Sequence, residues 1–204
     1  MKTMVRKSVA CVLLFAVLLV ACSNTQLVGE PSNHSKYASA LSLPKEEACK
    51  IIGIKREDMS EIVIETFATP LKAELAGRTF DVRLGFNALS EEEELTQIIY
   101  ISIYPDQSDI TVQGVDAIVT ALTERYGEPS QQSDSWKEDE PIPYGYNYWD
   151  LTETVSQELS AYMEQLEEEY GGPAYYQMVL SISEDAGACA VKITYMVGVI
   201  PSKK

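Results

Sequence analysis

The sequence predicts a single α+β domain, in which an antiparallel sheet of about five to seven strands carries two main amphipathic helices on one face. Short segments of alternating apolar and polar residues recur along the chain, and this period of two is typical of half-buried strands. Two longer segments repeat their apolar residues at helical spacing, and each ends at a glycine with a proline shortly after it.

The first part of this domain is expected to be a short helix followed by strands. Pro44 suits the first turn of a helix, and Gly53 suits its end. Strands are expected over residues 62–67, 80–86 and 95–104, where β-branched or alternating apolar residues are concentrated. The last of these strands has two sets of side chains on opposite faces, namely Ile99, Ile101 and Ile103 on one face and Tyr100, Ser102 and Tyr104 on the other.

The second part is expected to place two helices among further strands. The first helix covers residues 115–126 and stops at Gly127. The second helix starts at a capping box formed by Asp150 and Glu153, and it ends at Gly171. The strands expected in this part are 130–136 at a sheet edge, 144–149, and a closing hairpin of 176–182 and 191–197.

The two helices also suggest an internal strand–helix–strand duplication. Residues 122–129 and 166–173 lie 44 positions apart, both contain Tyr-Gly-x-Pro, and their preceding apolar positions match at the same offset. However, any amphipathic helix that stops at Gly-x-Pro would share these features. Both interpretations remain open at this point.

The start of the chain has the layout of a secretory signal. Lys2, Arg6 and Lys7 precede an uncharged run over 9–21, which is shorter than the roughly 20 apolar residues of a membrane-spanning helix. The run closes on Leu-Val-Ala followed by Cys22. This arrangement resembles the lipobox of bacterial lipoproteins, although an ordinary secretory peptide or a short membrane anchor is the alternative.

The lipoprotein resemblance covers residues 1–22 only, and it implies three regions. These are a signal peptide over 1–21, a lipid-anchored flexible tether over 22–41, and the α+β domain over 42–204. In that family the peptide is cut before the cysteine, so Cys22 would carry acyl chains such as palmitate on its thiol. The protein would then be held by lipid in the cell envelope, facing outside the cytoplasm: at the outer membrane or periplasm if the host has two membranes, and at the cell surface if it has one.

Composition excludes several classes of function. The chain has 31 acidic and 16 basic residues, and this excess of negative charge disfavours nucleic-acid partners, whose phosphates would be repelled. The only histidine, His34, lies in the expected tether, so a histidine-dependent catalytic triad is excluded from the folded part. No phosphate-binding loop, metal-ligand spacing or cofactor motif is present, and no catalytic residue is assigned.

Two cysteines remain after the signal peptide and the lipidated residue are set aside. Cys49 and Cys189 would form a disulfide in an oxidising compartment, or they would be two buried free thiols in an organism that seldom makes disulfides. Both interpretations remain open.

Aromatic residues are concentrated around one proline-containing loop. The expected binding residues there are Trp136, Tyr144, Tyr146, Tyr148 and Trp149. Core packing by the same side chains is the alternative. The leading hypothesis is therefore a non-catalytic, lipid-anchored envelope protein that contacts a protein or an envelope polymer. The alternatives are a carboxylate-based cell-wall hydrolase and a lipoprotein that binds a small ligand or carbohydrate.

Overall fold

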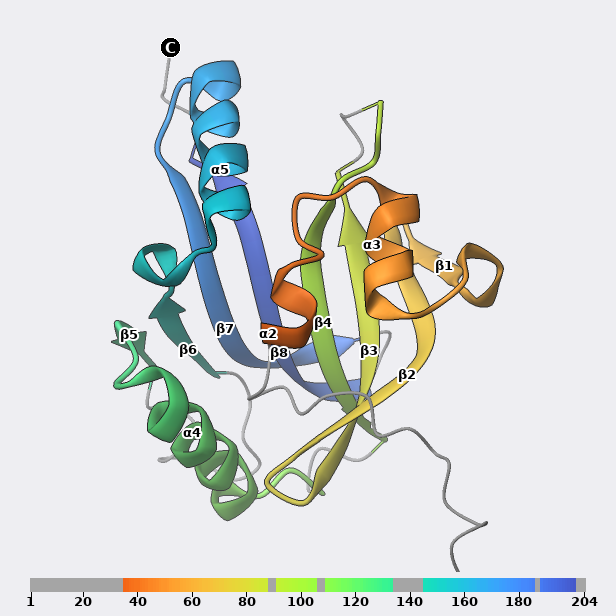
Figure 1. Cartoon of the computed structure of the whole chain (residues 1–204). Helices are drawn as coiled ribbons and strands as arrows, with labels where there is room; N and C mark the ends of the chain where they lie inside the picture. The colour runs from red at the N-terminus through yellow and green to blue at the C-terminus, as the bar shows by residue number, and fades with distance from the viewer. Residues whose placement is uncertain (1–34, 88–90, 106–108, 134–144, 186–187, 201–204) are drawn as a thin grey trace, which may run out of the picture.

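Eight strands form one antiparallel sheet in the computed structural model, which describes residues 35–87, 91–105, 109–133, 145–185 and 188–200 (Figure 1). The strands are β1 (Ser60–Val63), β2 (Thr66–Leu75), β3 (Arg78–Phe86), β4 (Leu95–Tyr104), β5 (Gln131–Gln132), β6 (Gly145–Asp150), β7 (Ala174–Asp185) and β8 (Ala188–Val199). Their order across the sheet is β1-β2-β3-β4-β8-β7-β6-β5. The predicted α+β class is confirmed, but the sheet has eight strands instead of five to seven.

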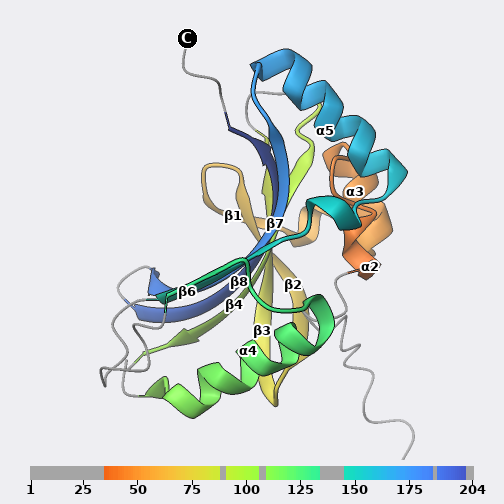
Figure 2. The ribbon, with the colours of Figure 1, turned by 90° about the vertical axis from the view of Figure 1, so that its left-hand side faces the viewer.

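The helices lie together on one side of the sheet, which is called the helix face below (Figures 1 and 2). They are α2 (Ser35–Ala38), α3 (Lys45–Ile52), α4 (Val112–Tyr126) and α5 (Gln157–Tyr170), with short 3-10 turns η2 (Arg56–Asp58) and η5 (Thr152–Thr154). The α4 helix buries one stripe of Val115, Ile118 and Leu122, and α5 buries Leu159, Met163 and Leu166. Both stripes follow the helical spacing that the sequence predicts.

The strand registers bring apolar side chains into continuous rows on the helix face. One row crosses five neighbouring strands and consists of Leu84, Ile98, Tyr195, Met178 and Trp149. Every member of this row is almost completely buried. Because directly opposed residues on neighbouring strands share a face, this row fixes which side of each strand the helices cover.

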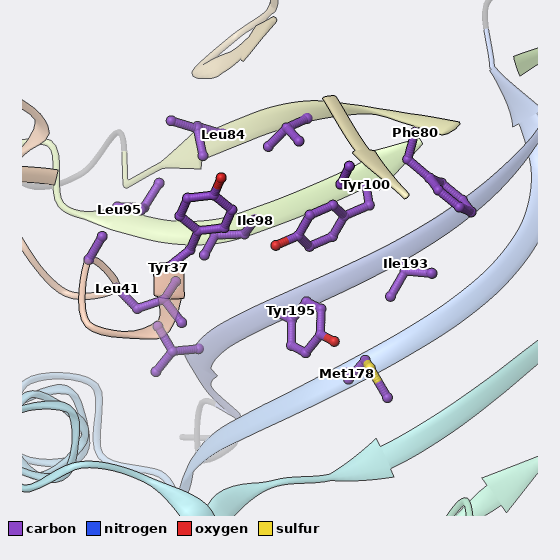
Figure 3. Close-up of a cluster of buried hydrophobic side chains, with 14 of the residues drawn as sticks. Tyr37, Leu41, Phe80, Leu84, Leu95, Ile98, Tyr100, Met178, Ile193 and Tyr195 are labelled. Atoms are coloured by element: carbon purple, nitrogen blue, oxygen red, sulfur yellow. The ribbon is translucent and has the colours of Figure 1, made fainter. Parts of the chain in front are cut away.

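Tyrosines occupy the centre of the core between the helices and strands β4, β7 and β8. Figure 3 shows Tyr37, Tyr100 and Tyr195 close together, and the rings of Tyr100 and Tyr195 meet edge to face with centroids 5.9 Å apart. The hydroxyl of Tyr195 donates to that of Tyr126 on α4 at 3.2 Å. Burial raises the pKa of Tyr37 to about 12 and raises that of Tyr100 well above its usual value, so these phenols stay neutral.

The predicted strand over 62–67 is instead a hairpin. The turn falls at Ile64 and Glu65, and Glu65 has a positive φ of 63°, which no regular strand contains. The second arm, β2, then passes through Pro70 at an irregularity in its pairing with β3. Beyond Ala68 the pairing of β1 with β2 has ended, so Pro70 lies at a sheet edge, where the missing N–H costs little.

The second long helix begins later than its predicted capping box. Asp150 is the last residue of β6, and its carboxylate accepts a hydrogen bond from the N–H of Thr152 at 3.0 Å, in the turn that leads into η5. Val155 is extended, and Ser156 is the N-cap of α5, accepting from the N–H of Leu159 at 3.3 Å. A serine side chain therefore starts this helix, as N-cap preferences would allow.

The folded domain also begins before its predicted boundary at residue 42. Tyr37, Ala40 and Leu41 are buried in the core, so residues expected in a flexible tether belong to the domain. The backbone carbonyl of Leu95 accepts a hydrogen bond from the N–H of Ser42 at 2.8 Å, which ties this segment to β4. Spacing alone did not reveal this segment, because it is short and mostly Ala and Ser.

The sheet order does not arrange the two halves of the suggested duplication alike. At the offset of 44 residues, β4 and β5 would correspond to β6 and β7. However, β6 and β7 are antiparallel neighbours, whereas β4 and β5 are separated by the three strands β8, β7 and β6. The helix ends differ as well, because ψ is −173° at Gly127 and 36° at Gly171.

Candidate functional site on the open face of the sheet

The face of the sheet opposite the helices is called the open face, because none of the described helices packs against it (Figure 2). The strand registers place two central rows of side chains on it. One row is Asp81, Ile101, Lys192, Ser181 and Tyr146, and the next is Arg83, Ile99, Thr194, Val179 and Tyr148. Both rows alternate with the buried rows of the helix face, as the pleat requires.

Apolar side chains occupy the middle of the open face. Ile101 is fully buried by its neighbours on the sheet, whereas the side chain of Ile103 at the end of β4 is 43% exposed. Tyr146 on β6 is 48% exposed, and Ile99 and Val179 in the neighbouring row are half-buried. Large apolar and aromatic side chains that solvent can reach, framed by polar ones, are typical of protein-binding surfaces.

A second group of aromatic residues lies at the other end of this face. Tyr175 packs across Gly198 of the neighbouring strand, and a Cβ atom at Gly198 would lie 2.6 Å from the Tyr175 hydroxyl. Burial, followed by the nearby Asp150 and Tyr175, raises the pKa of Tyr148. Hydrogen bonds from Thr152 hold the pKa of Asp150 below its usual range, so this end of the face carries a fixed negative charge.

Charge is balanced on the open face and strongly negative on the helix side. The basic side chains Lys72, Arg83 and Lys192 accompany the acidic Glu74, Asp81 and Asp150 on the described open face. Lys72 and Asp81 form an ion pair across two strands. In contrast, α5 carries five glutamates and neither lysine nor arginine. The glutamates of α5 therefore lie on the side of the sheet away from the open face.

The structure separates the aromatic residues that the sequence grouped together. Tyr146 and Tyr148 both lie on the open face, as the predicted alternation requires. Trp149 does not: it is 1% exposed, it belongs to the core, and its indole N–H donates to the carbonyl oxygen of Gly127 at 2.9 Å. Its assignment as a binding residue is corrected here, because successive residues of a strand face opposite ways. Trp136 and Tyr144 lie outside the described residues.

The two cysteines of the domain are free thiols in the structure. Cys49 is buried on α3, with its sulfur 3.9 Å from that of Met59, and Cys189 is half-buried at the start of β8. Burial raises the pKa of both thiols, which makes them poor nucleophiles. The lipidation candidate, Cys22, lies outside the described residues.

Some members of this surface were not singled out from the sequence. Alternation divided β4 into an isoleucine face and a tyrosine face but did not tell which one the helices cover. Tyr175 had no signal beyond its place in a strand.

In the described ranges, no three histidine, cysteine or acidic side chains come together as metal ligands. None of the helices that the structure describes has the length and hydrophobicity to cross a membrane. No protein-family model, curated protein or solved structure matches this chain.

Proposed function

We propose that this protein is a lipid-anchored, non-catalytic binding protein of the cell envelope, and that its open face docks a partner protein. The observation that carries this proposal is the apolar surface that the described helices leave uncovered, where Ile103 and Tyr146 are both about half exposed. Tyrosine contributes a large rigid contact area with a polar tip, and it is enriched among residues that dominate binding energy.

The charge of the open face favours a protein partner over a polymer of uniform charge. Arg83, Lys192 and Asp150 present both signs close to an apolar centre. Such a mixture complements another protein surface, whereas nucleic acids and anionic envelope polymers select a field of positive sign. The glutamates of α5 would repel anionic polymers from the other side of the domain.

The carboxylates of the open face are poorly suited to glycoside hydrolysis. Such hydrolysis requires one carboxyl group whose raised pKa keeps it protonated as a general acid. Asp150 has a lowered pKa because Thr152 donates hydrogen bonds to it, and Asp81 is paired with Lys72. The hydrogen bonds from Thr152 favour the charged form of Asp150, which supports binding over catalysis.

Lipid on Cys22 would leave the open face available to the partner. Each buried methylene contributes about 0.8 kcal/mol, so two acyl chains suffice for stable anchoring without any contact between the domain and the bilayer. From Cys22 to Ser35 is 13 residues, which span at most about 45 Å when fully extended. The domain can therefore reach a partner beside the membrane.

Site-specific photo-crosslinking in intact cells tests this proposal. A photoreactive phenylalanine replaces Tyr146 on the open face or, as a control, Ile51 on α3, whose exposure is nearly the same at 46%. We expect position 146 to yield one discrete crosslinked protein, position 51 not to yield it, and Ile103→Asp to abolish the crosslink at 146.

Two results would contradict the proposed docking on the open face. One is a set of identical crosslinked proteins from positions 146 and 51. The other is an Ile103→Asp variant that captures the partner as well as the wild type does and has the same melting temperature. Retention of the wild-type protein, but not of Ile103→Asp, on purified envelope glycan would favour the polymer alternative instead.

A further inference from the structure

A cavity of about 740 Å³ lies on the helix side of the domain, away from the open face. Three separate parts of the chain line it together with Tyr176 of β7: residues 38–51 with α2 and α3, the end of α4, and residues 151–159 with η5 and the start of α5. Its volume is within the range of small-molecule sites, and such sites are usually apolar with a few polar groups at defined places.

Core residues form the apolar floor of this helix-side cavity. Leu41, Leu151, Leu159 and Tyr176 line it, and all four are buried in the hydrophobic core. Because their positions are fixed by packing against the sheet, the cavity does not need to be created by a ligand. An apolar body would bury against them.

One cation faces this cavity without a carboxylate partner. Within the described part of the chain, Arg125 at the end of α4 has no acidic oxygen within 4.0 Å. Its guanidinium carbon lies 5.9 Å from the ring centroid of Tyr126, which also lines the cavity. A guanidinium supplies several N–H donors in a fork that matches a carboxylate.

Tyr176 adds a neutral polar group to the lining of the cavity. Burial, followed by the nearby Tyr126, raises the pKa of Tyr176, so its hydroxyl stays protonated at physiological pH. The cavity lining therefore offers the neutral hydroxyl of Tyr176 as well as Arg125, and no described acidic oxygen lies within 4.0 Å of that guanidinium.

Two carboxylates on the rim restrict the charge of the ligand. Glu47 and Glu158 also line the cavity, and hydrogen bonds from its own N–H and from Ser156 lower the pKa of Glu158. A second acidic group on a ligand would be repelled by these charges. We infer that the helix-side cavity binds a small monocarboxylate with an apolar body, whose carboxylate pairs with Arg125.

Calorimetric titration of the intact chain in lipid nanodiscs tests this inference. The probes are phenylalkanoates from phenylacetate to 6-phenylhexanoate, each compared with the alcohol and the amine of the same carbon skeleton. We expect the best acid to bind at least tenfold more tightly than its alcohol, and the amine to bind less tightly than either. Empty nanodiscs give the background from partition into lipid.

Variants of two lining residues distinguish charge recognition from apolar partition. Arg125→Gln should weaken binding of the acid at least tenfold and change binding of the alcohol less than twofold. Ser39→Trp, at an exposed position on the rim, should fill the entrance and abolish binding of both. Unchanged circular dichroism and melting temperature confirm that each variant is folded.

Three outcomes would overturn the inference. They are equal affinity for acid and alcohol, unchanged acid binding in Arg125→Gln, and no saturable binding of any acid in the series. None of them bears on the partner crosslinked at Tyr146, which lies on the opposite face of the sheet. The inference about the cavity and the proposed docking on the open face can therefore be rejected independently.

Discussion

The ammonium group of Lys45 lies 2.9 Å from a carboxylate oxygen of Glu93 and 4.0 Å from the ring centroid of Phe67. Lys45 begins α3 and is only 5% exposed, whereas Glu93 lies in the connection before β4. The ring of Phe86, 4.9 Å away, adds a second aromatic contact. This cluster attaches α3 to β2 and to the β3–β4 hairpin.

Two substitutions of Lys45 should separate the contribution of its packing to the free energy of unfolding from the contribution of its charge. Lys45→Ala removes the buried alkyl chain and the cation, and we expect a loss of about 2 kcal/mol in the free energy of unfolding. Lys45→Met keeps most of the volume and should cost less than about 1 kcal/mol, because the half-exposed Glu93 can be solvated again. Urea denaturation measures both, and equal losses would contradict this division.

The Lys45–Glu93 pair also predicts a pH dependence of stability. The hydrogen bond from Lys45 lowers the pKa of Glu93 in the folded protein, so the unfolded chain binds the proton more readily. The contribution is therefore present above the unfolded pKa and is lost as the pH falls through the folded pKa. Because Glu93 is 43% exposed, it is below about 1 kcal/mol.

The measurement compares urea denaturation at pH 6 and pH 3 for three proteins. Glu93→Gln should lose less stability on acidification than the wild type. Glu91→Gln, at an exposed position nearby, should behave like the wild type. If all three proteins lose the same amount of stability between pH 6 and pH 3, the ion pair does not contribute to stability.

Trp149 should act on stability and not on binding. Trp149→Phe removes the indole N–H that Gly127 accepts and leaves a gap in the core, and we expect a loss of about 1 to 3 kcal/mol. Tyr146→Phe, on the open face, should change stability by less than about 0.5 kcal/mol. A stable Trp149→Phe protein that no longer captures the partner would place this residue back in the binding surface.

The contact between Tyr175 and Gly198 is accessible to a double-mutant cycle. Gly198→Ala would bring a methyl group within 2.8 Å of the Tyr175 ring carbon that bears the hydroxyl, so the ring must move. We expect Gly198→Ala to destabilise the wild type by about 1 kcal/mol and the Tyr175→Ala variant by clearly less. Equal losses in the two backgrounds would mean that the ring does not rest on this glycine.

Lipidation is tested at Cys22. In the native host, mass spectrometry of the purified protein should find a chain that begins at Cys22 and carries acyl chains on it. Cys22→Ala should leave the signal peptide in place and remove the acyl mass. A wild-type chain with an intact amino terminus, or with an unmodified thiol at Cys22, would contradict the anchor.

Local sequence signals predicted most element types and several of their ends. Gly53 and Gly171 end their helices in the left-handed conformation that a glycine C-cap favours. Strict alternation identified β3 and β4, as well as the closing hairpin of β7 and β8. Local signals failed where tertiary contacts decide, as in the turn at Glu65 and the late start of α5 at Ser156.

The candidate site depended on long-range information that one sequence does not contain. Residues of β6 alternate, so Tyr146 and Tyr148 had to lie together and Trp149 apart from them. Which set would face the helices followed only from the pairing of β6 with β7 and of β8 with β4. The surroundings of Arg125 are equally invisible in the sequence, because the cavity that it lines is built from separate parts of the chain.

The central position of β8 has a consequence for how the chain must fold. Without β8, the sheet would be cut into a group of β1 to β4 and a group of β5 to β7, each with a newly exposed edge. Since a ribosome delivers residues 188–199 after the other strands of this sheet, the two groups stay unjoined until β8 has been made. During that interval each group exposes an unpaired strand edge, and such edges favour aggregation.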